Sequence, residues 1–126
     1  MEIIKDAEFE EKVLQSGSPV LVDFYADWCG PCKMMAPVVE ELSKKYEGRC
    51  QMYKINVDND QEAAGRYRVM SIPTFILFAE GEAKEIITGA VPLAQLEEVV
   101  KKYENIEVVR LEIKYPQGAE KQLIYA

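Results

Sequence analysis

Hydrophobic and polar residues follow two periods along the chain, and these predict helices and strands in alternation. Helices are expected over residues 7–16, 33–46, 60–68 and 92–103. Short runs of apolar and strand-forming residues predict strands over residues 20–25, 51–57, 74–78 and 84–88. The resulting order is helix, strand, helix, strand, helix, strand, strand, helix. It predicts an α/β layer fold with a mixed sheet, in which early crossovers precede a late hairpin.

A few residues refine this pattern. Glu80-Gly81 suits a tight turn between the last two strands. Pro92 suits the start of the last helix, whereas Pro37 lies inside the helix over residues 33–46 and should kink it. Asp23 interrupts the apolar strand over residues 20–25, and a carboxylate inside a buried strand is unusual.

The end of the chain has a different pattern. Val109, Leu111, Ile113 and Tyr115 alternate with charged residues, as in a half-buried strand. A turn signal at residues 116–118 and a short apolar run at 122–125 follow, which predicts an added β-hairpin. We therefore expect one α/β domain over residues 1–104 and an extension over residues 105–126. The extension packs on the domain itself or on a partner chain, and both alternatives stay open.

Composition narrows the class of protein. The chain has 126 residues, 48% of them hydrophobic and 29% charged, which is typical of one soluble domain. With 15 basic and 22 acidic residues the net charge is −7, which argues against nucleic acid and anionic membranes as partners. No apolar run reaches the ~18 residues of a membrane span. Because the first residues resemble no signal peptide, we expect a cytoplasmic protein.

The cysteines carry the candidate chemistry. There are three of them and no histidine, which excludes a Cys-His dyad and a His-ligated or four-cysteine zinc site. Cys29 and Cys32 are separated by two residues at a predicted strand-to-helix turn, and such a pair binds a metal or cycles between dithiol and disulfide. The redox interpretation is favoured because only Cys50 remains as another soft ligand. A purely structural disulfide and an inert dithiol stay as alternatives.

The spacing has a physical reason. Cys29 would lie at a helix N-terminus, where backbone N–H groups and the helix dipole favour a thiolate and make it nucleophilic. Pro31 suits the first helical turn, and Cys32 lies one turn further, ready to attack a mixed disulfide.

The surrounding residues resemble the thioredoxin family. The stretch Val22-Asp23-Phe24-Tyr25-Ala26-Asp27-Trp28-Cys29-Gly30-Pro31-Cys32-Lys33 resembles that family's active-site signature. Further matches follow in order along roughly residues 2–103: Pro37, Lys54-Ile55-Asn56-Val57-Asp58, Ser71-Ile72-Pro73-Thr74 and Gly89. The resemblance implies a thioredoxin fold, with a central mixed sheet flanked by helices on both faces. Residues 105–126 lie outside it.

The resemblance also implies roles for the catalytic residues. Cys29 resembles the attacking cysteine and Cys32 the resolving one. Asp23 resembles the buried acid that exchanges a proton with Cys32, and Lys54 the lysine that tunes the pKa of this acid. The chemistry agrees, because without histidine a desolvated carboxylate is a suitable proton acceptor. The alternatives are a structural carboxylate at Asp23 and an exposed strand lysine at Lys54.

Other matched residues are implied to bind the substrate. Trp28 would shield the site and contact substrate, together with Gly30 and Pro31. The Ile72-Pro73 bond would be cis, face the disulfide and shape a peptide groove, and Gly89 would leave room for a substrate backbone. A core aromatic at Trp28 and an ordinary strand-end glycine at Gly89 are the alternatives.

Two residues depart from the family pattern or lie outside it. Tyr25 stands where many thioredoxins carry a second tryptophan. Cys50 has no role in the motif and is interpreted as a partly buried small hydrophobic residue, with a regulatory thiol as the alternative.

These observations favour a protein-disulfide reductase that works through a mixed disulfide and is recycled by a thioredoxin reductase-type donor. Its substrates would be disulfide-containing proteins, and the domain would bind no cofactor or metal. An oxidase or isomerase of the same family is one alternative, although Gly30-Pro31 resembles the reducing members. A thioredoxin-fold interaction module is the other, suggested by the C-terminal extension. We expect a monomer, with a dimer through the extension as the alternative.

Overall fold

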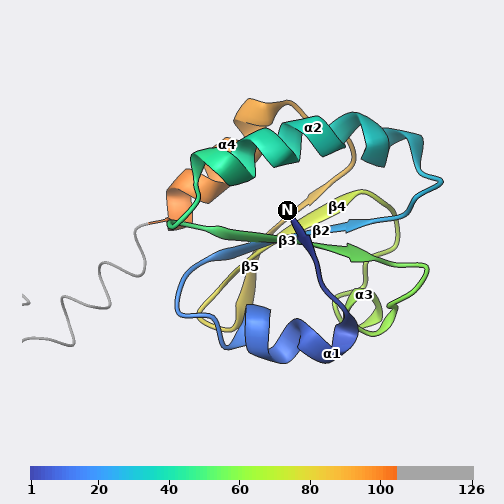
Figure 1. Cartoon of the computed structure of the whole chain (residues 1–126), viewed down its shortest axis with the longest axis horizontal. Coiled ribbons are helices and arrows are strands. Elements are labelled where there is room, and N and C mark those ends of the chain that lie inside the picture. The colour runs from blue at the N-terminus through green and yellow to red at the C-terminus, as the bar shows by residue number, and fades with distance from the viewer. Residues whose placement is uncertain (105–126) are drawn as a thin grey trace, which may run out of the picture.

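The computed structural model describes residues 1–104 and confirms the α/β class (Figure 1). Residues 105–126, with the expected C-terminal hairpin, lie outside the described part of the chain. The elements in chain order are β1 (Glu2–Ile3), α1 (Asp6–Phe9), a π-helical segment (Glu10–Leu14), β2 (Val20–Tyr25), α2 (Gly30–Lys45), β3 (Gln51–Asn56), α3 (Glu62–Arg66), β4 (Thr74–Ala79), β5 (Glu82–Thr88) and α4 (Leu93–Tyr103).

Five strands form one mixed sheet in the order β1-β3-β2-β4-β5. β1 and β2 run parallel to β3, whereas β4 runs antiparallel to both β2 and β5. The predicted turn between the last two strands is present, with positive φ at both Glu80 and Gly81. Because β2 and β3 are central, residues at their carboxyl ends meet at one edge of the sheet, where α2 begins.

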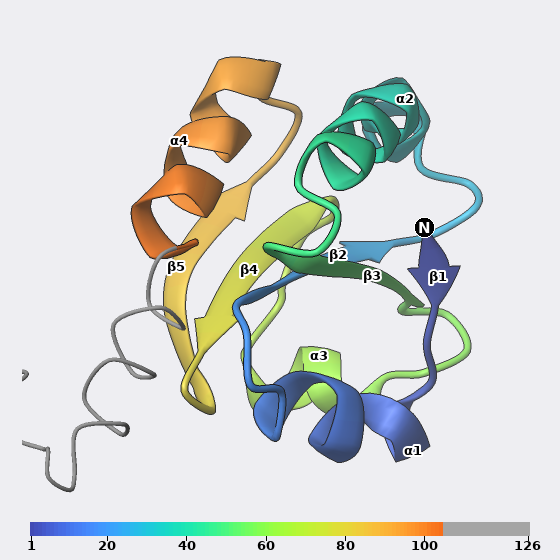
Figure 2. The ribbon, with the colours of Figure 1, turned by 60° about the vertical axis from the view of Figure 1, so that its left-hand side comes forward.

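Helices cover both faces of the sheet, as predicted. α2 and α4 lie on one face, and α1 and α3 lie on the other (Figures 1 and 2). Alternation along β2 divides its residues between these two layers. Leu21 packs with residues of α2 and α4, whereas Val22 and Phe24 pack with residues of α1 and α3. Asp23 therefore lies on the face that α2 covers.

The structure corrects several boundaries. The predicted helix over 7–16 divides into α1 and the π-helical segment, and the helix over 60–68 shortens to Glu62–Arg66. β1 was not predicted, because a two-residue strand leaves no periodic pattern. Pro37 lies inside α2, and Pro92 is the N-cap of α4, both where the sequence predicts them. No helix within residues 1–104 is long and apolar enough to cross a membrane.

Candidate active site

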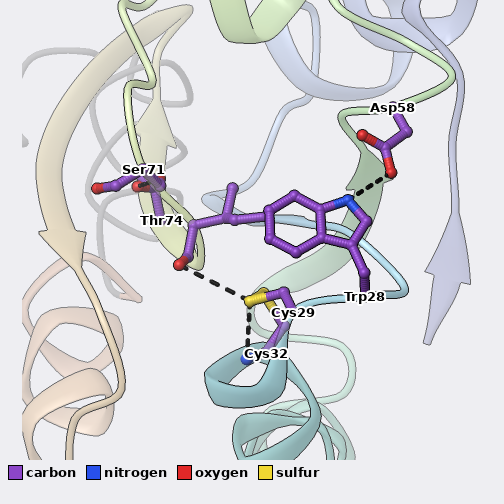
Figure 3. The surroundings of a disulfide bond; sticks show 7 residues. Trp28, Cys29, Cys32, Asp58, Ser71 and Thr74 are labelled. Atoms are coloured by element: carbon purple, nitrogen blue, oxygen red, sulfur yellow. Dashed lines mark hydrogen bonds between the residues drawn. A yellow bond between two sulfur atoms is a disulfide. The ribbon is translucent and has the colours of Figure 1, made fainter.

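The two cysteines of the motif form a disulfide where the chain passes from β2 into α2. Cys29 is the N-cap of α2, and its Cα lies 5.2 Å from that of Cys32. The backbone N–H of Cys32 donates a hydrogen bond to Sγ of Cys29 at 3.2 Å (Figure 3). The sequence-based placement of Cys29 at a helix N-terminus is therefore confirmed.

This position favours a thiolate once the disulfide is reduced. The first N–H groups of a helix lack partners within the helix, and their dipoles stabilise negative charge. One of them already points at Cys29 Sγ, and the first turn of α2 contains no acidic residue. Pro31 lies in this turn, where its missing N–H costs no helical hydrogen bond.

An apolar groove of about 460 Å³ opens beside the disulfide. Ile72 lines it opposite Cys29, and the carbonyl oxygen of Ile72 lies 3.8 Å from Sγ of Cys29. Trp28 forms part of the rim with 69% of its surface exposed, which contradicts a core role for this aromatic side chain. Its indole N–H donates to Oδ2 of Asp58 at 2.8 Å (Figure 3). The groove is lined by Trp28, Cys29, Gly30, Pro31, Val57, Val69, Met70, Ser71 and Ile72.

The segment that ends in Pro73 forms one wall of this groove through Ser71 and Ile72. The Ile72-Pro73 bond is cis, as the resemblance implied. Thr74 Oγ1 donates to the carbonyl oxygen of Ser71 at 2.6 Å, which closes the turn. The N–H of Gly89 donates to the carbonyl oxygen of Pro73 at 2.8 Å.

Gly89 does not line the groove, although it is bound to the segment that does. It has a φ of +93°, which disfavours any other residue, and a Cβ added there would meet open space. The backbone conformation is thus one reason for glycine at this position.

Asp23 is a buried carboxylate on the face of the sheet below α2. It is 4% exposed, and its Oδ1 has no hydrogen-bond partner among the described residues. Loss of hydration raises the pKa of Asp23 to about 7, and the nearby charge of Lys54 opposes part of that rise. Asp23 thus changes its protonation state near neutral pH.

Lys54 stands in register with Asp23 on the neighbouring parallel strand. It is half-buried, and its Nζ lies 4.3 Å from the centre of the Tyr25 ring. A small hollow of about 130 Å³ is lined by Tyr25, Lys54 and Cys32, together with Ala26, Asp27, Lys33 and Ala36. The structure therefore brings the lysine and the second cysteine to one hollow, and Lys54 joins it from the same face of the sheet as Asp23.

Cys50 lies away from this site. It is 3% exposed and belongs to the core below α2 and α4, with Met52 and Tyr46. Burial raises the pKa of its thiol to about 12. The interpretation as a small hydrophobic residue is confirmed, and the residue is fully rather than partly buried.

Some groove residues were not predicted from the sequence. Val69, Met70 and Ser71 carry no local chemical signal, although Ser71 lies inside the quoted motif. Asp58 also lay in a quoted motif, but its bond to Trp28 joins residues 30 positions apart. Within residues 1–104, no three His, Cys, Asp or Glu side chains gather as they would around a metal ion.

A cysteine pair that closes into a disulfide at a helix N-cap, open to an apolar groove, defines a thiol–disulfide oxidoreductase. Similarity of the sequence to known proteins identifies the family. The family model described as Thioredoxin matches residues 1–102, and the chain belongs to the thioredoxin family. It is a thioredoxin-type disulfide reductase with a Cys29-x-x-Cys32 active-site pair.

Individual relatives agree with this family. The chain is 47% identical over 100 residues to the thioredoxin of Synechocystis sp., covering 79% of this chain and 94% of that protein. It is 47% identical over 103 residues to the chloroplastic M-type thioredoxin of Pisum sativum, covering 82% of this chain. It is 48% identical over 100 residues to the chloroplastic M-type thioredoxin of Spinacia oleracea, covering 79% of this chain. The matched part spans 60% of the pea protein and 55% of the spinach protein.

Proposed function

We propose that this chain reduces disulfide bonds in other proteins, with Cys29 as the attacking and Cys32 as the resolving cysteine. The observation that carries the assignment is the N-cap position of Cys29, whose Sγ accepts the N–H of Cys32. The same residue lines the groove, whereas Cys32 lies one turn inside the helix and lines the small hollow. This asymmetry gives the two sulfur atoms different roles.

The reaction has two exchange steps. The Cys29 thiolate attacks one sulfur of the substrate disulfide, forms a mixed disulfide and displaces the other substrate sulfur as a thiolate. The Cys32 thiolate then attacks Sγ of Cys29, releases the second substrate sulfur and closes the Cys29–Cys32 disulfide. Two electrons pass to the substrate in this sequence. A reductase of the thioredoxin reductase type then supplies two further electrons, which reduce the Cys29–Cys32 disulfide to the dithiol again.

Asp23 is proposed to accept the proton of Cys32 in the second step. Its pKa of about 7 supports this role, because an acceptor works best when its pKa lies near the working pH. Lys54 is proposed to keep the carboxyl partly ionised by its charge. A water molecule in the hollow would carry the proton between the two groups.

The groove is proposed to hold the substrate chain next to its disulfide. Trp28, Gly30, Pro31 and Ile72 line it, and their surfaces suit an extended apolar peptide. Pro73 and Gly89 are proposed to act through the backbone, since Pro73 is buried and its carbonyl accepts the Gly89 N–H.

The experiment is a disulfide-reduction assay with insulin as substrate and dithiothreitol as the electron source. We expect the wild-type chain to accelerate reduction, Cys29→Ser to abolish it, and Cys32→Ser to accumulate a mixed disulfide that mass spectrometry detects. Retained activity in Cys29→Ser would refute the assignment. The reduction potential separates a reductase from an oxidase: thioredoxin itself has about −270 mV, and oxidising members lie near about −180 to −120 mV.

The location and oligomeric state are also proposals. We propose a monomer that works in the cytoplasm, in agreement with the two cysteine thiols being used as reductants. Removing residues 107–126 and measuring the mass by light scattering tests this state. The mass of one chain both before and after removal agrees with a monomer, and a change from the mass of two full-length chains to that of one shortened chain indicates a dimer held by the extension.

A further inference from the structure

Asp23, Tyr25 and Lys54 form one patch of the sheet under the start of α2. Asp23 and Tyr25 are two positions apart on β2, so their side chains leave the same face of the strand. Lys54 is the register partner of Asp23 on β3, which puts its side chain on that face as well. Cys32 of α2 lines the same hollow as Tyr25 and Lys54.

We propose that Tyr25 is a positioning residue whose ring holds the ammonium group of Lys54 over Asp23, and thereby sets the proton affinity of that carboxyl. This inference rests on the proposed role of Asp23 as proton acceptor. Nζ of Lys54 lies 4.3 Å from the ring centre, inside the distance of about 6 Å at which an aromatic face attracts a cation. Tyr25 is 8% exposed, so the ring itself is fixed by packing.

Among the described residues, the ammonium group of Lys54 has few other contacts that would fix its position. This group lies at the end of a flexible four-carbon chain, and Lys54 is only half-buried. Within residues 1–104, Nζ of Lys54 forms no ion pair at 4.0 Å or less. Without the ring it would turn toward water, where its attraction for a buried carboxylate is screened.

The other charged groups around the hollow do not replace this contact. Asp27 and Lys33 line it and are both exposed, and Cys32 lines it as a buried residue. Tyr25 carries no charge at neutral pH, since a tyrosine ordinarily has a pKa near 10, and burial and the neighbouring Asp27 and Asp23 raise that pKa further. Tyr25 therefore acts on Asp23 through the place of Lys54.

The arrangement bears on the resolving step. A carboxyl accepts the proton of Cys32 only in its ionised form, and a cation held nearby increases the ionised fraction at neutral pH. If the ring were removed, Asp23 would keep its proton to higher pH. The second exchange step would then slow near neutrality and recover as the pH rises.

The test is a carbon-13 NMR titration of the Asp23 carboxyl in the oxidised, full-length chain. Tyr25→Phe keeps the ring and should titrate like the wild type. Tyr25→Leu removes the ring and should raise the midpoint by roughly 0.5 pH unit or more, as expected from the cation–ring attraction. Lys54→Met should raise the midpoint further, and adding Tyr25→Leu to Lys54→Met should change nothing more.

Two results would overturn the proposal. One is a wild-type midpoint in Tyr25→Leu, and the other is an equal rise caused by Tyr25→Leu with and without Lys54, which would indicate altered burial of Asp23. Tyr25→Met is a second ring-free variant in case the leucine variant does not fold. The titration follows the oxidised protein, so its outcome is independent of whether the chain reduces insulin.

Discussion

The indole N–H of Trp28 donates a hydrogen bond to Oδ2 of Asp58 at 2.8 Å, across 30 positions of sequence. Asp58 is itself held, because its N–H donates to Oδ1 of Asn56 at the end of β3. The bond fixes an exposed aromatic ring next to the disulfide without covering it. The rim of the groove is thereby prepared before a substrate arrives, which lowers the entropy lost on binding.

Replacing Asp58 should weaken substrate binding. Loss of one hydrogen bond of about 1 kcal/mol predicts a rise in KM for insulin of about five-fold in Asp58→Ala, with a smaller change in kcat. Asp58→Asn keeps an acceptor, and its KM should lie between those of the wild type and Asp58→Ala. Trp28 is the single tryptophan of the chain, so its fluorescence emission reports the same change. Glu11→Gln changes an exposed charge that does not line the groove and is the control. An unchanged KM and emission in Asp58→Ala would contradict the prediction.

Asp23 should make folding stability depend on pH. Its pKa is raised to about 7 in the folded state, against an ordinary value near 4, so the native chain binds more protons than the unfolded chain between these values. Stability should therefore fall as the pH rises from about 4 to 7. Asp23→Asn removes this titration. The difference in free energy of unfolding between Asp23→Asn and the wild type should therefore shift in favour of the variant between pH 4 and pH 8, by up to about 4 kcal/mol.

Guanidinium unfolding of the oxidised protein at pH 4 and pH 8 measures this difference. Glu41→Gln, on the exposed side of α2, is a control with the same change in charge. A stability gap between Asp23→Asn and the wild type that is the same at both pH values would show that Asp23 does not titrate in this range.

Most of the fold follows from local patterns. The apolar runs of β2 and β4 and the helical spacing of α2 appear directly in the sequence, because each element is long enough to repeat its period. β1 has two residues and gains its order from pairing with Tyr53 and Lys54 of β3, so no local signal exists for it. The start of α3 is fixed by Asp6, whose carboxylate accepts the N–H groups of Glu62 and Ala63 at 2.9 and 3.0 Å, and no local sequence pattern marks a cap that comes from 56 positions away.

Some residues of the site could likewise be predicted from local sequence, and others depend on the tertiary structure. Cys29 and Cys32 are predictable, since two residues of spacing and a helix start decide their geometry. Asp23 stands out as a charge in an apolar strand, but its pairing with Lys54 depends on the register of β2 with β3. Met70 could not be predicted as a groove residue from the sequence, because a loop places it at the groove and no periodic pattern marks it.

Met70 gives a prediction on substrate recognition. It lines the groove with 91% of its surface exposed, whereas Met34 on α2 is 70% exposed and does not line it. Met70→Gln should lower kcat/KM for insulin by about three- to ten-fold through lost apolar contact, and Met34→Gln should have less effect. Reduction of a small aromatic disulfide, which does not fill the groove, should change little in either variant. Equal losses in the two variants would assign no special role to the groove.

Cys50 should be chemically silent in the folded protein. Its thiol is buried, and burial raises its pKa to about 12, against about 8.5 for a free cysteine. The thiolate fraction at pH 8 is then lower by about three orders of magnitude. In the reduced native chain, iodoacetamide should modify Cys29 first and Cys32 more slowly, and Cys50 only after guanidinium is added. Mass spectrometry counts the modified groups.

Cys50→Ala should leave the reduction potential of the pair unchanged and cost about 1 kcal/mol of stability through lost packing. If Cys50 reacts in the native state as fast as Cys32, its surroundings open in solution and the buried position does not protect it.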